Sequence, residues 1–500
     1  MYNFNRNFKH KLRSKTHLNS SHKKSSLPYS HTHPYSVFSY LYRFAFLLIF
    51  PVIQSLLFNP TTLTATIANL GLNILFVIIL VILSFMEYQK TTYCLHLDHL
   101  HIKKGVFTCK YSKIAYSKIT SIVIKKNVLP SLFACAKIYI ETAGNVKRKN
   151  DFLLILSYKR ANLLLNKIYP LSSATHVYKS SIFRIFLMAL TWSNSVTGLL
   201  FFAPFVKNLG VILGKEFSKT LYDGVNFAVY IASIGLPPTT AYIAGILIFG
   251  FAIAFTVQIF RYGRFSVCKH KTSIIIRRGL IARSIFATTL ANINAFSTHQ
   301  SILMLIFNLQ TVYIHTIGLG KTKGEKNMLI SAESSYIIKN ILSLLIPPPC
   351  EIFLTLRPKN SRIFSFLYLP LFALISIIPL YYILISINIY KELLNLILVF
   401  LLFLLSIWLI FRVVAFKRTS LSITSKEVIA TGFKKLNIIE TTINLENLQS
   451  VLITQTIFQK FSKSCNVNFY IFAENRTFYT VKHLDYFKTI DIVSKINLSS

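Results

Sequence analysis

The sequence predicts a multi-pass α-helical membrane protein in which six transmembrane helices form three hairpins, each followed by a small α+β module. Three observations lead to this fold class: 53% of the 500 residues are hydrophobic, apolar runs occur in pairs, and the polar segments between the pairs are similar to one another. Only 14% of the residues are charged, whereas soluble proteins carry about 25%. The 55 Lys and Arg residues outnumber the 16 Asp and Glu residues, which gives a formal charge of +39. Such an excess is also typical of nucleic-acid binding, but long uncharged apolar runs favour a membrane protein with basic parts on one side.

Residues 1–37 are predicted to be a disordered basic tail. The segment is rich in Ser, His, Asn, Lys and Arg and contains no sustained apolar run, so it cannot bury enough apolar surface to fold. It is also too long and too polar to be the positively charged start of a cleavable signal peptide.

Three segments, 38–90, 172–262 and 348–416, each contain two apolar runs. A run near 20 residues can cross a bilayer as a helix, so we expect each segment to form a transmembrane hairpin. The linker of the middle hairpin contains a further apolar stretch, which leaves the topology of residues 207–240 open. The six predicted spans are Phe44–Phe58, Ile67–Met86, Ile185–Val206, Ala241–Phe260, Ile363–Ile387 and Leu393–Phe416.

The distribution of Lys and Arg sets the expected orientation. Seven of these residues lie in the tail, the short loop between the first two spans has none, and the segments after each hairpin are dense in cations. Because cytoplasmic loops carry the excess of positive charge, we expect the N-terminus and the modules to be cytoplasmic. The predicted location is the cell membrane.

The segments after the hairpins are copies of one module, predicted at 91–171, 263–347 and 417–500. The sequence IKKGVF at residues 102–107 recurs as IRRGLI at residues 276–281, and this offset of 174 (276 − 102) persists without a gap to Gly144 and Gly318. A more distant third copy begins at LSITSKEVIATGF, where Gly432 takes the glycine position. Alternating apolar residues predict short strands, and each copy closes with a helix-like stretch. We therefore expect a bent antiparallel sheet or barrel with one C-terminal helix.

These motifs give the chain a family resemblance. They are L-x-x-D-x-L-x-I-x-x-G-V-F (Leu95–Phe107), I-x-x-x-K-I-T-S-I (Ile114–Ile122) and IYIETAG (Ile138–Gly144) in the first copy, TLANINAFSTHQS in the second, and VIATGF with INLENLQSVLITQTIFQKF in the third. The chain resembles bacterial pleckstrin-homology-like (PH-like) membrane proteins of the three-repeat type, which have a transmembrane hairpin before each domain. The resemblance implies PH-like modules and a role in binding or assembly, although a fold does not fix a function.

No catalytic, metal or cofactor site is predicted, and the chain is expected not to be an enzyme. GLGKTKG at 318–324 is similar to the end of a phosphate-binding loop, but His315 stands where that motif needs a glycine. His96, His99 and His101 cluster in the first copy, and the last two share a strand face from which they can in principle ligate a metal. No acidic or cysteine partner completes that site, so histidines that face the membrane or solvent are the preferred interpretation.

The excess of cations is the main functional signal. A module tethered beside the inner leaflet needs little further attraction to lie against it, and each Lys or Arg near anionic lipid contributes about 1 kcal/mol. A merely solvated cationic surface is the alternative. The candidate lipid contacts are Lys103, Lys104, Lys125, Lys126, Arg277, Arg278, Lys434 and Lys435.

The sequence therefore predicts a non-enzymatic integral membrane scaffold or binding protein that acts in maintenance of the cell envelope. Its expected partners are anionic membrane lipids, together with other proteins or further copies of the chain, but not nucleic acid. The alternative function is a transporter or channel component built from the hairpins.

Overall fold

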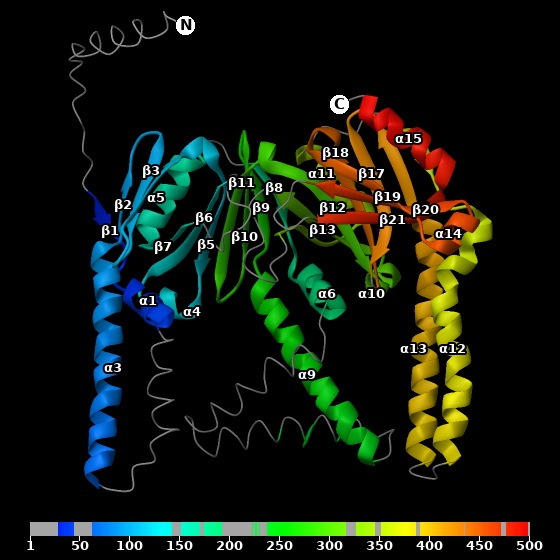
Figure 1. Ribbon diagram of the computed structural model, residues 1–500, viewed down its shortest axis with the longest axis horizontal. Coiled ribbons are helices and arrows are strands. Elements are labelled where there is room, and N and C mark those ends of the chain that lie inside the picture. Colours follow the sequence, from blue (N-terminus) through cyan, green and yellow to red (C-terminus); the bar gives the residue numbers. More distant parts are fainter. Residues whose placement is uncertain are drawn as a thin grey trace, which may run out of the picture. The chain divides into compact units, whose positions relative to one another are not determined.

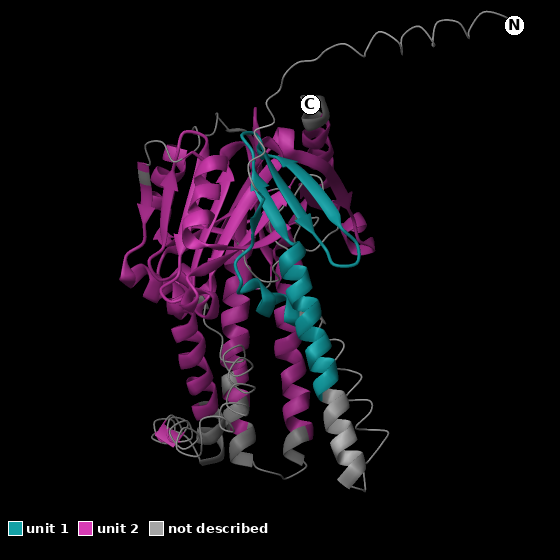
Figure 2. Ribbon diagram, turned by 90° about the vertical axis from the view of Figure 1, so that its left-hand side faces the viewer, with its two compact units in different colours: residues 1–116 teal, residues 117–500 magenta. Residues whose placement is uncertain are grey.

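The computed structural model describes residues 29–44, 63–142, 152–170, 175–192, 223, 226–227, 230, 238–316, 327–345, 352–386, 391–434, 436–471 and 477–498. The chain divides into two compact units, residues 1–116 and 117–500 (Figure 2). Of the predicted features, residues 1–28 of the tail, most of the first predicted span, residues 193–206 of the third, and GLGKTKG lie outside the described residues.

The described part of unit 1 combines two α-helices with a four-stranded antiparallel sheet. The strand order is β1-β2-β3-β4, and β3 pairs with both β2 and β4. Tyr93, Leu100 and Ile102 point to its buried face. Strand β1 lies inside the segment 1–37 that was predicted to be disordered, so that segment contributes a strand to the sheet. The elements are β1 (Ser30–His31), α1 (Ser36–Phe44), α3 (Leu63–Lys90), β2 (Thr92–Leu95), β3 (His99–Lys104) and β4 (Lys110–Ala115).

Unit 2 contains two seven-stranded sheets and one three-stranded sheet. The first sheet has the order β7-β6-β5-β11-β10-β9-β8, the second β14-β13-β12-β18-β17-β16-β15, and the third β19-β20-β21. Their strands are β5 (Ile119–Lys126), β6 (Cys135–Thr142), β7 (Phe152–Ser157), β8 (Thr175–Lys179), β9 (Ser266–Lys269), β10 (Ser273–Arg278), β11 (Arg283–Thr289), β12 (Ile293–Ser301), β13 (Leu309–Thr316), β14 (Asn327–Ser334), β15 (Ile352–Leu356), β16 (Ser420–Thr424), β17 (Glu427–Lys434), β18 (Asn437–Asn444), β19 (Leu448–Thr454), β20 (Ser464–Ile471) and β21 (Thr477–Asp485).

The same strand pattern occurs three times along the chain. Four strands form a meander, three more follow, and a helix closes the copy, so β1–β7, β8–β14 and β15–β21 correspond to one another. The first strand of each meander precedes the apolar segment, where the sequence had placed only tail or hairpin. The closing helices are α5 (Tyr158–Ile168), α11 (Ser335–Leu345) and α15 (Tyr486–Leu498). They lie within the helix-like stretches that the sequence indicates at 158–169, 331–346 and 483–498.

Each seven-stranded sheet joins strands from two consecutive copies. In the first sheet, β5 of the first copy pairs antiparallel with β11 of the second, with Ser121 opposite Thr288. The Thr288 hydroxyl also donates to the carbonyl oxygen of Thr120 at 2.9 Å. In the second sheet, β12 pairs with β18 of the third copy. The modules of unit 2 are therefore not separate sheets in a row, because their strands complete one another.

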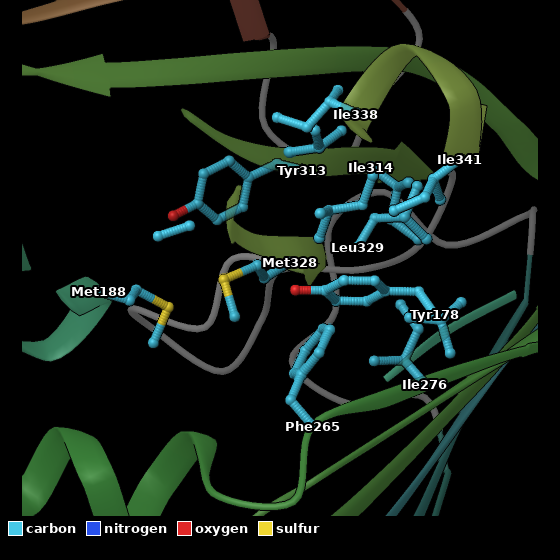
Figure 3. Packing of buried hydrophobic residues seen from close by; sticks show 14 of the residues in the cluster. Tyr178, Met188, Phe265, Ile276, Tyr313, Ile314, Met328, Leu329, Ile338 and Ile341 are labelled. Atoms are coloured by element: carbon cyan, nitrogen blue, oxygen red, sulfur yellow. The ribbon is translucent and has the colours of Figure 1, made fainter. Parts of the chain in front are cut away.

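The main hydrophobic core of unit 2 lies between strands of both seven-stranded sheets. Tyr178 of β8 and Ile276 of β10 face Ile314 of β13 and Ile338 of α11 (Figure 3). Strand alternation puts these side chains on one face of each sheet, and the amphipathic helix α11 covers them. A second core, which includes Leu421, Val467 and Phe469, fills the third copy.

Two described helices are long and apolar enough to cross a membrane. They are residues Gly245–Tyr262 of α9 (Pro238–Tyr262) and Asn360–Ile383, which cover most of α12 (Ile363–Ser386). The six predicted spans are therefore not confirmed. Helix α13 (Lys391–Arg418) lies alongside α12 (Figure 1). The remaining α-helices among the described residues are α4 (Val128–Leu132), α6 (Ile182–Trp192), α10 (Ile302–Ile306) and α14 (Ile457–Phe461).

Arg362 joins the start of α12 to the third copy. Its side chain is buried, and the guanidinium donates to the carbonyl oxygens of Leu484, Ser462 and Lys463, each at 2.9 Å. The Leu484 carbonyl lies near the end of β21, and the other two directly follow α14. One cation therefore holds the start of α12 against two elements of the third copy.

We expect Arg362→Met to lower the free energy of unfolding by about 3 kcal/mol or more, because a hydrogen bond to a charged group contributes about 1.5–3 kcal/mol and the carbonyls lose their partner. Thermal unfolding of the detergent-solubilised chain measures the effect. The exposed Arg357 provides the matched control Arg357→Met. Equal stability of the two variants would contradict this role for Arg362.

Candidate functional site

The candidate site is built where the third strand of each copy ends against the helix that enters that copy. We call these three places the helix–sheet junctions: the end of β3 with α3, the end of β10 with α9, and the end of β17 with α13. The recurrent IKKGVF and IRRGLI segments occupy the first two junctions. In both copies the segment forms the end of a strand and a turn.

The glycine in this turn is required by the backbone. Gly105 and Gly279 have φ angles of +120° and +103°, and a Cβ atom on them would come within 2.0 Å and 2.1 Å of the carbonyl oxygens of Thr108 and Ala282. Gly432 differs, since it lies within β17. A Cβ atom added there would come within 2.4 Å of the Thr480 carbonyl oxygen. The third glycine therefore serves close packing between strands and not a turn.

At the second junction, the turn after β10 is hydrogen-bonded directly to the end of α9. The Gly279 amide donates to the Gly263 carbonyl at 2.8 Å, and the Leu280 amide donates to the Phe260 carbonyl at 2.9 Å. The Arg278 guanidinium lies 5.5 Å from the centre of the Tyr262 ring. Because α9 is one of the two described helices that are long and apolar enough to cross a membrane, this end of the sheet adjoins a candidate membrane segment.

Strand pairing gathers further cations at the same end of the sheet. Lys125 of β5 and Arg278 of β10 both stand opposite Ser284 of β11, and Lys126 stands opposite Arg283. Lys137 of β6 continues the row beside Lys125. Two copies thus contribute cations to one end of the sheet, which we call the cationic sheet end. Its members are Lys125, Lys126, Lys137, Arg277, Arg278 and Arg283.

Aromatic rings support several of these cations. The ammonium of Lys125 lies 5.3 Å from the Tyr139 ring centre, and that of Lys126 lies 4.1 Å from the Tyr158 ring centre. Burial, and then the charge of Arg283, lowers the pKa of Lys126. Side chains held this way present their charge in defined positions.

The first junction belongs to unit 1. Lys104 lies 3.9 Å from a Glu87 carboxylate oxygen near the end of α3 and 5.5 Å from the Tyr40 ring centre. Lys103 lies 5.2 Å from the ring centre of Tyr111.

The third junction is a cluster of cations around Phe433. The guanidinium of Arg412 on α13 lies 4.7 Å from the Phe433 ring centre, and the Lys482 ammonium lies 5.2 Å from it on another side. Phe366 of α12 packs at 5.4 Å between ring centres. Lys434 follows on the exposed end of β17, whereas Lys435 lies outside the described residues.

The structure thus brings four predicted contacts of unit 2 together, Lys125, Lys126, Arg277 and Arg278, and places Lys434 at a different junction. Arg283 and Lys137 also belong to the cationic sheet end but were not predicted from the sequence. No sequence signal identifies them, because they join the row only through pairing between strands of different copies.

A histidine cluster lies near the first junction, on the hairpin of β2 and β3. The ring centres of His96, His99 and His101 are 4.6–4.8 Å apart. The pKa values of His99 and His101 lie below the usual value, first because the rings are desolvated and also because Lys113 is nearby. The sequence placed only His99 and His101 on one face, and the hairpin turn adds His96 to them.

Ser297 also contacts two histidines inside unit 2, and its hydroxyl lies 3.1 Å from His299 Nε2. The Ser297 hydroxyl lies 2.7 Å from His315 Nε2, and the Tyr479 hydroxyl lies 2.8 Å from the same nitrogen. Ser297 is fully buried, so substrate cannot reach it. The group is best explained as a buried hydrogen-bond network between the second and third copies.

Comparison with known proteins agrees with this repeated architecture. A family profile described as "Bacterial PH domain" matches residues 46–170, 224–344 and 364–486. The chain belongs to this family. The PH modules of this chain thus account for the three sequence repeats, and the resemblance seen in the sequence is confirmed.

A curated relative is the UPF0699 transmembrane protein YdbT of Bacillus subtilis (strain 168), which is 25% identical over 285 residues. The match covers 52% of this chain and 56% of the relative, so this chain spans about half the length of that protein. Together with the apolar helices, this likeness supports the membrane character of the PH-module protein.

We expect the third junction to make stability depend on pH through His483. Burial, followed by the charges of Lys482, Arg362 and Arg412, lowers the pKa of His483 to about 4. Below pH 6.5 His483 becomes protonated in the unfolded chain, whereas in the folded chain it stays neutral until about pH 4. The free energy of unfolding is therefore highest above pH 6.5 and falls as the pH drops from 6.5 to about 4. After allowance for solvent screening of this partly exposed ring, the loss at pH 4 is about 2 kcal/mol.

Thermal unfolding of wild type and His483→Asn between pH 7 and pH 4 measures this dependence. Asparagine tolerates the positive φ of 59° at this position and cannot titrate. A variant with the same pH dependence as wild type would show that another group is responsible.

Proposed function

We propose that this protein is a non-enzymatic, multi-pass membrane scaffold whose PH modules lie on the anionic inner leaflet. The observation that carries the proposal is the cationic sheet end, which is hydrogen-bonded through the turn at Gly279 to the end of α9. Cations that adjoin a membrane-spanning helix reach the level of the lipid headgroups without any movement of the module.

Electrostatics supplies enough energy for such a contact. Each cation near an anionic leaflet contributes about 1 kcal/mol, and the tether removes most of the entropy cost of bringing a module to the membrane.

The excess of positive charge supports a cytoplasmic location of the N-terminus and the PH modules, since cations collect on that side. Binding of lipids, and of proteins held near them, fits a role in maintenance of the cell envelope. Neither the comparisons nor the described residues favour the alternative of a transporter.

The test is the affinity of the detergent-solubilised full chain for phosphatidylglycerol in mixed micelles, with phosphatidylcholine as the neutral lipid. The double variant Arg277→Gln/Arg278→Gln removes two charges from the cationic sheet end. At about 1 kcal/mol each, we expect the affinity for phosphatidylglycerol to fall about 30-fold in low salt, and the difference to shrink in high salt.

The matched control is Lys118→Gln/Lys271→Gln, which removes two exposed charges from the opposite ends of β5 and β10. This control should bind almost as well as wild type. Equal losses of affinity in both double variants would mean that only the net charge matters and would contradict a specific role of the cationic sheet end. Equal binding of both lipids by the wild type would refute the proposal.

A further inference from the structure

We propose that His96, His99 and His101 form a binding site for a borderline divalent transition-metal ion of the Zn²⁺ class. The site lies on the hairpin of β2 and β3 in unit 1 and does not depend on the proposed lipid contact. It also differs from the sequence-based expectation, which foresaw no metal.

The hairpin turn creates the site. The His96 amide donates to the His99 carbonyl at 3.0 Å, which closes a turn with only two residues between them. Leu95 pairs with Leu100, so His96 stands directly opposite His99. His101 follows two residues after His99, and alternate residues of a strand share a face. All three imidazoles must therefore project from one side of this hairpin.

The ring nitrogens are close enough for one ion. One nitrogen from each histidine lies within 4.8 Å of the other two. A Zn–N bond of about 2.0–2.1 Å in tetrahedral geometry requires nitrogens roughly 3.4 Å apart. Small rotations about the side-chain torsions can close this difference, because the side chains are only partly buried.

An unpaired nitrogen points to a missing ligand. His101 Nε2 is buried and has no hydrogen-bond partner, although a buried polar atom without a partner costs about 1–3 kcal/mol. No carboxylate or thiol joins the three rings among the described residues. A metal bond would satisfy this nitrogen, which receives no hydrogen bond from the neighbouring imidazoles.

The donor set selects the class of ion. Imidazole suits Zn²⁺, Cu²⁺ and Ni²⁺, whereas Mg²⁺ and Ca²⁺ prefer oxygen ligands. Three histidines leave a fourth position of a tetrahedral ion for water or another ligand.

Lys113 of β4 opposes the ion. It stands opposite His101 in the strand register, and its charge acts on both His99 and His101. A cation beside the site weakens binding of a second cation. This residue therefore provides a variant whose effect has the opposite sign to that of losing a ligand.

The experiment is a Zn²⁺ titration by calorimetry of the full chain in detergent, purified without a polyhistidine tag. We expect one site that weakens at least about tenfold in His99→Gln and in His101→Gln, since even changes beyond the first ligands cause tenfold losses. His31→Gln, which alters an exposed histidine of β1 in the same sheet, should leave the affinity unchanged. Lys113→Gln should tighten binding.

Co²⁺ absorption of the same proteins adds a readout of tetrahedral imidazole ligation that protein stability does not produce. The proposal is wrong if wild type shows no site, if His99→Gln and His101→Gln bind as tightly as wild type, or if Lys113→Gln binds more weakly. A loss in His31→Gln equal to that in His99→Gln would also overturn it.

Discussion

The pairing of β5 with β11, and of β12 with β18, is the constraint on which the rest of unit 2 depends. Each pair joins strands from two consecutive copies, so each seven-stranded sheet forms only when both of its copies contribute their strands. An edge strand exposes unpaired backbone groups. Each of these pairings joins two strands that would otherwise be edge strands of separate sheets. The register between β5 and β11 then decides which side chains meet, and it places Lys126 opposite Arg283.

The second and third helix–sheet junctions hold cations of the sheets beside apolar helices. Backbone hydrogen bonds fix the turn after β10 to α9, and buried Arg362 fixes the start of α12 to the third copy. Both contacts use groups that are costly to leave unsatisfied when buried. The cations at these places are therefore positioned by the fold, and a flexible surface would not hold them in rows.

Much of the fold is predictable from the sequence, because the 174-residue offset and period-2 alternation identify three similar modules. Alternation shows which face a residue occupies but not which strand lies beside it, so the pairing of β5 with β11 could not be inferred. Strands β1, β8 and β15 are short, and an apolar segment separates each of them in the sequence from the next strand of its sheet. For this reason the sequence pattern did not identify them. His96 was missed as a partner of His99 because the sequence pattern favoured a turn at Asp98–His99, whereas the two residues of the turn are Leu97 and Asp98.

Cross-linking across β5 and β11 tests the central claim most directly. In a chain whose native cysteines are replaced by serine, Lys125→Cys with Ser284→Cys joins directly opposed residues of different copies. Lys125→Cys with Arg278→Cys lies two strands apart, at roughly 10 Å, beyond the reach of a disulfide. We expect rapid disulfide formation in the first pair and none in the second under mild oxidation. Failure of the first pair, or equal cross-linking of both, would contradict the shared sheet.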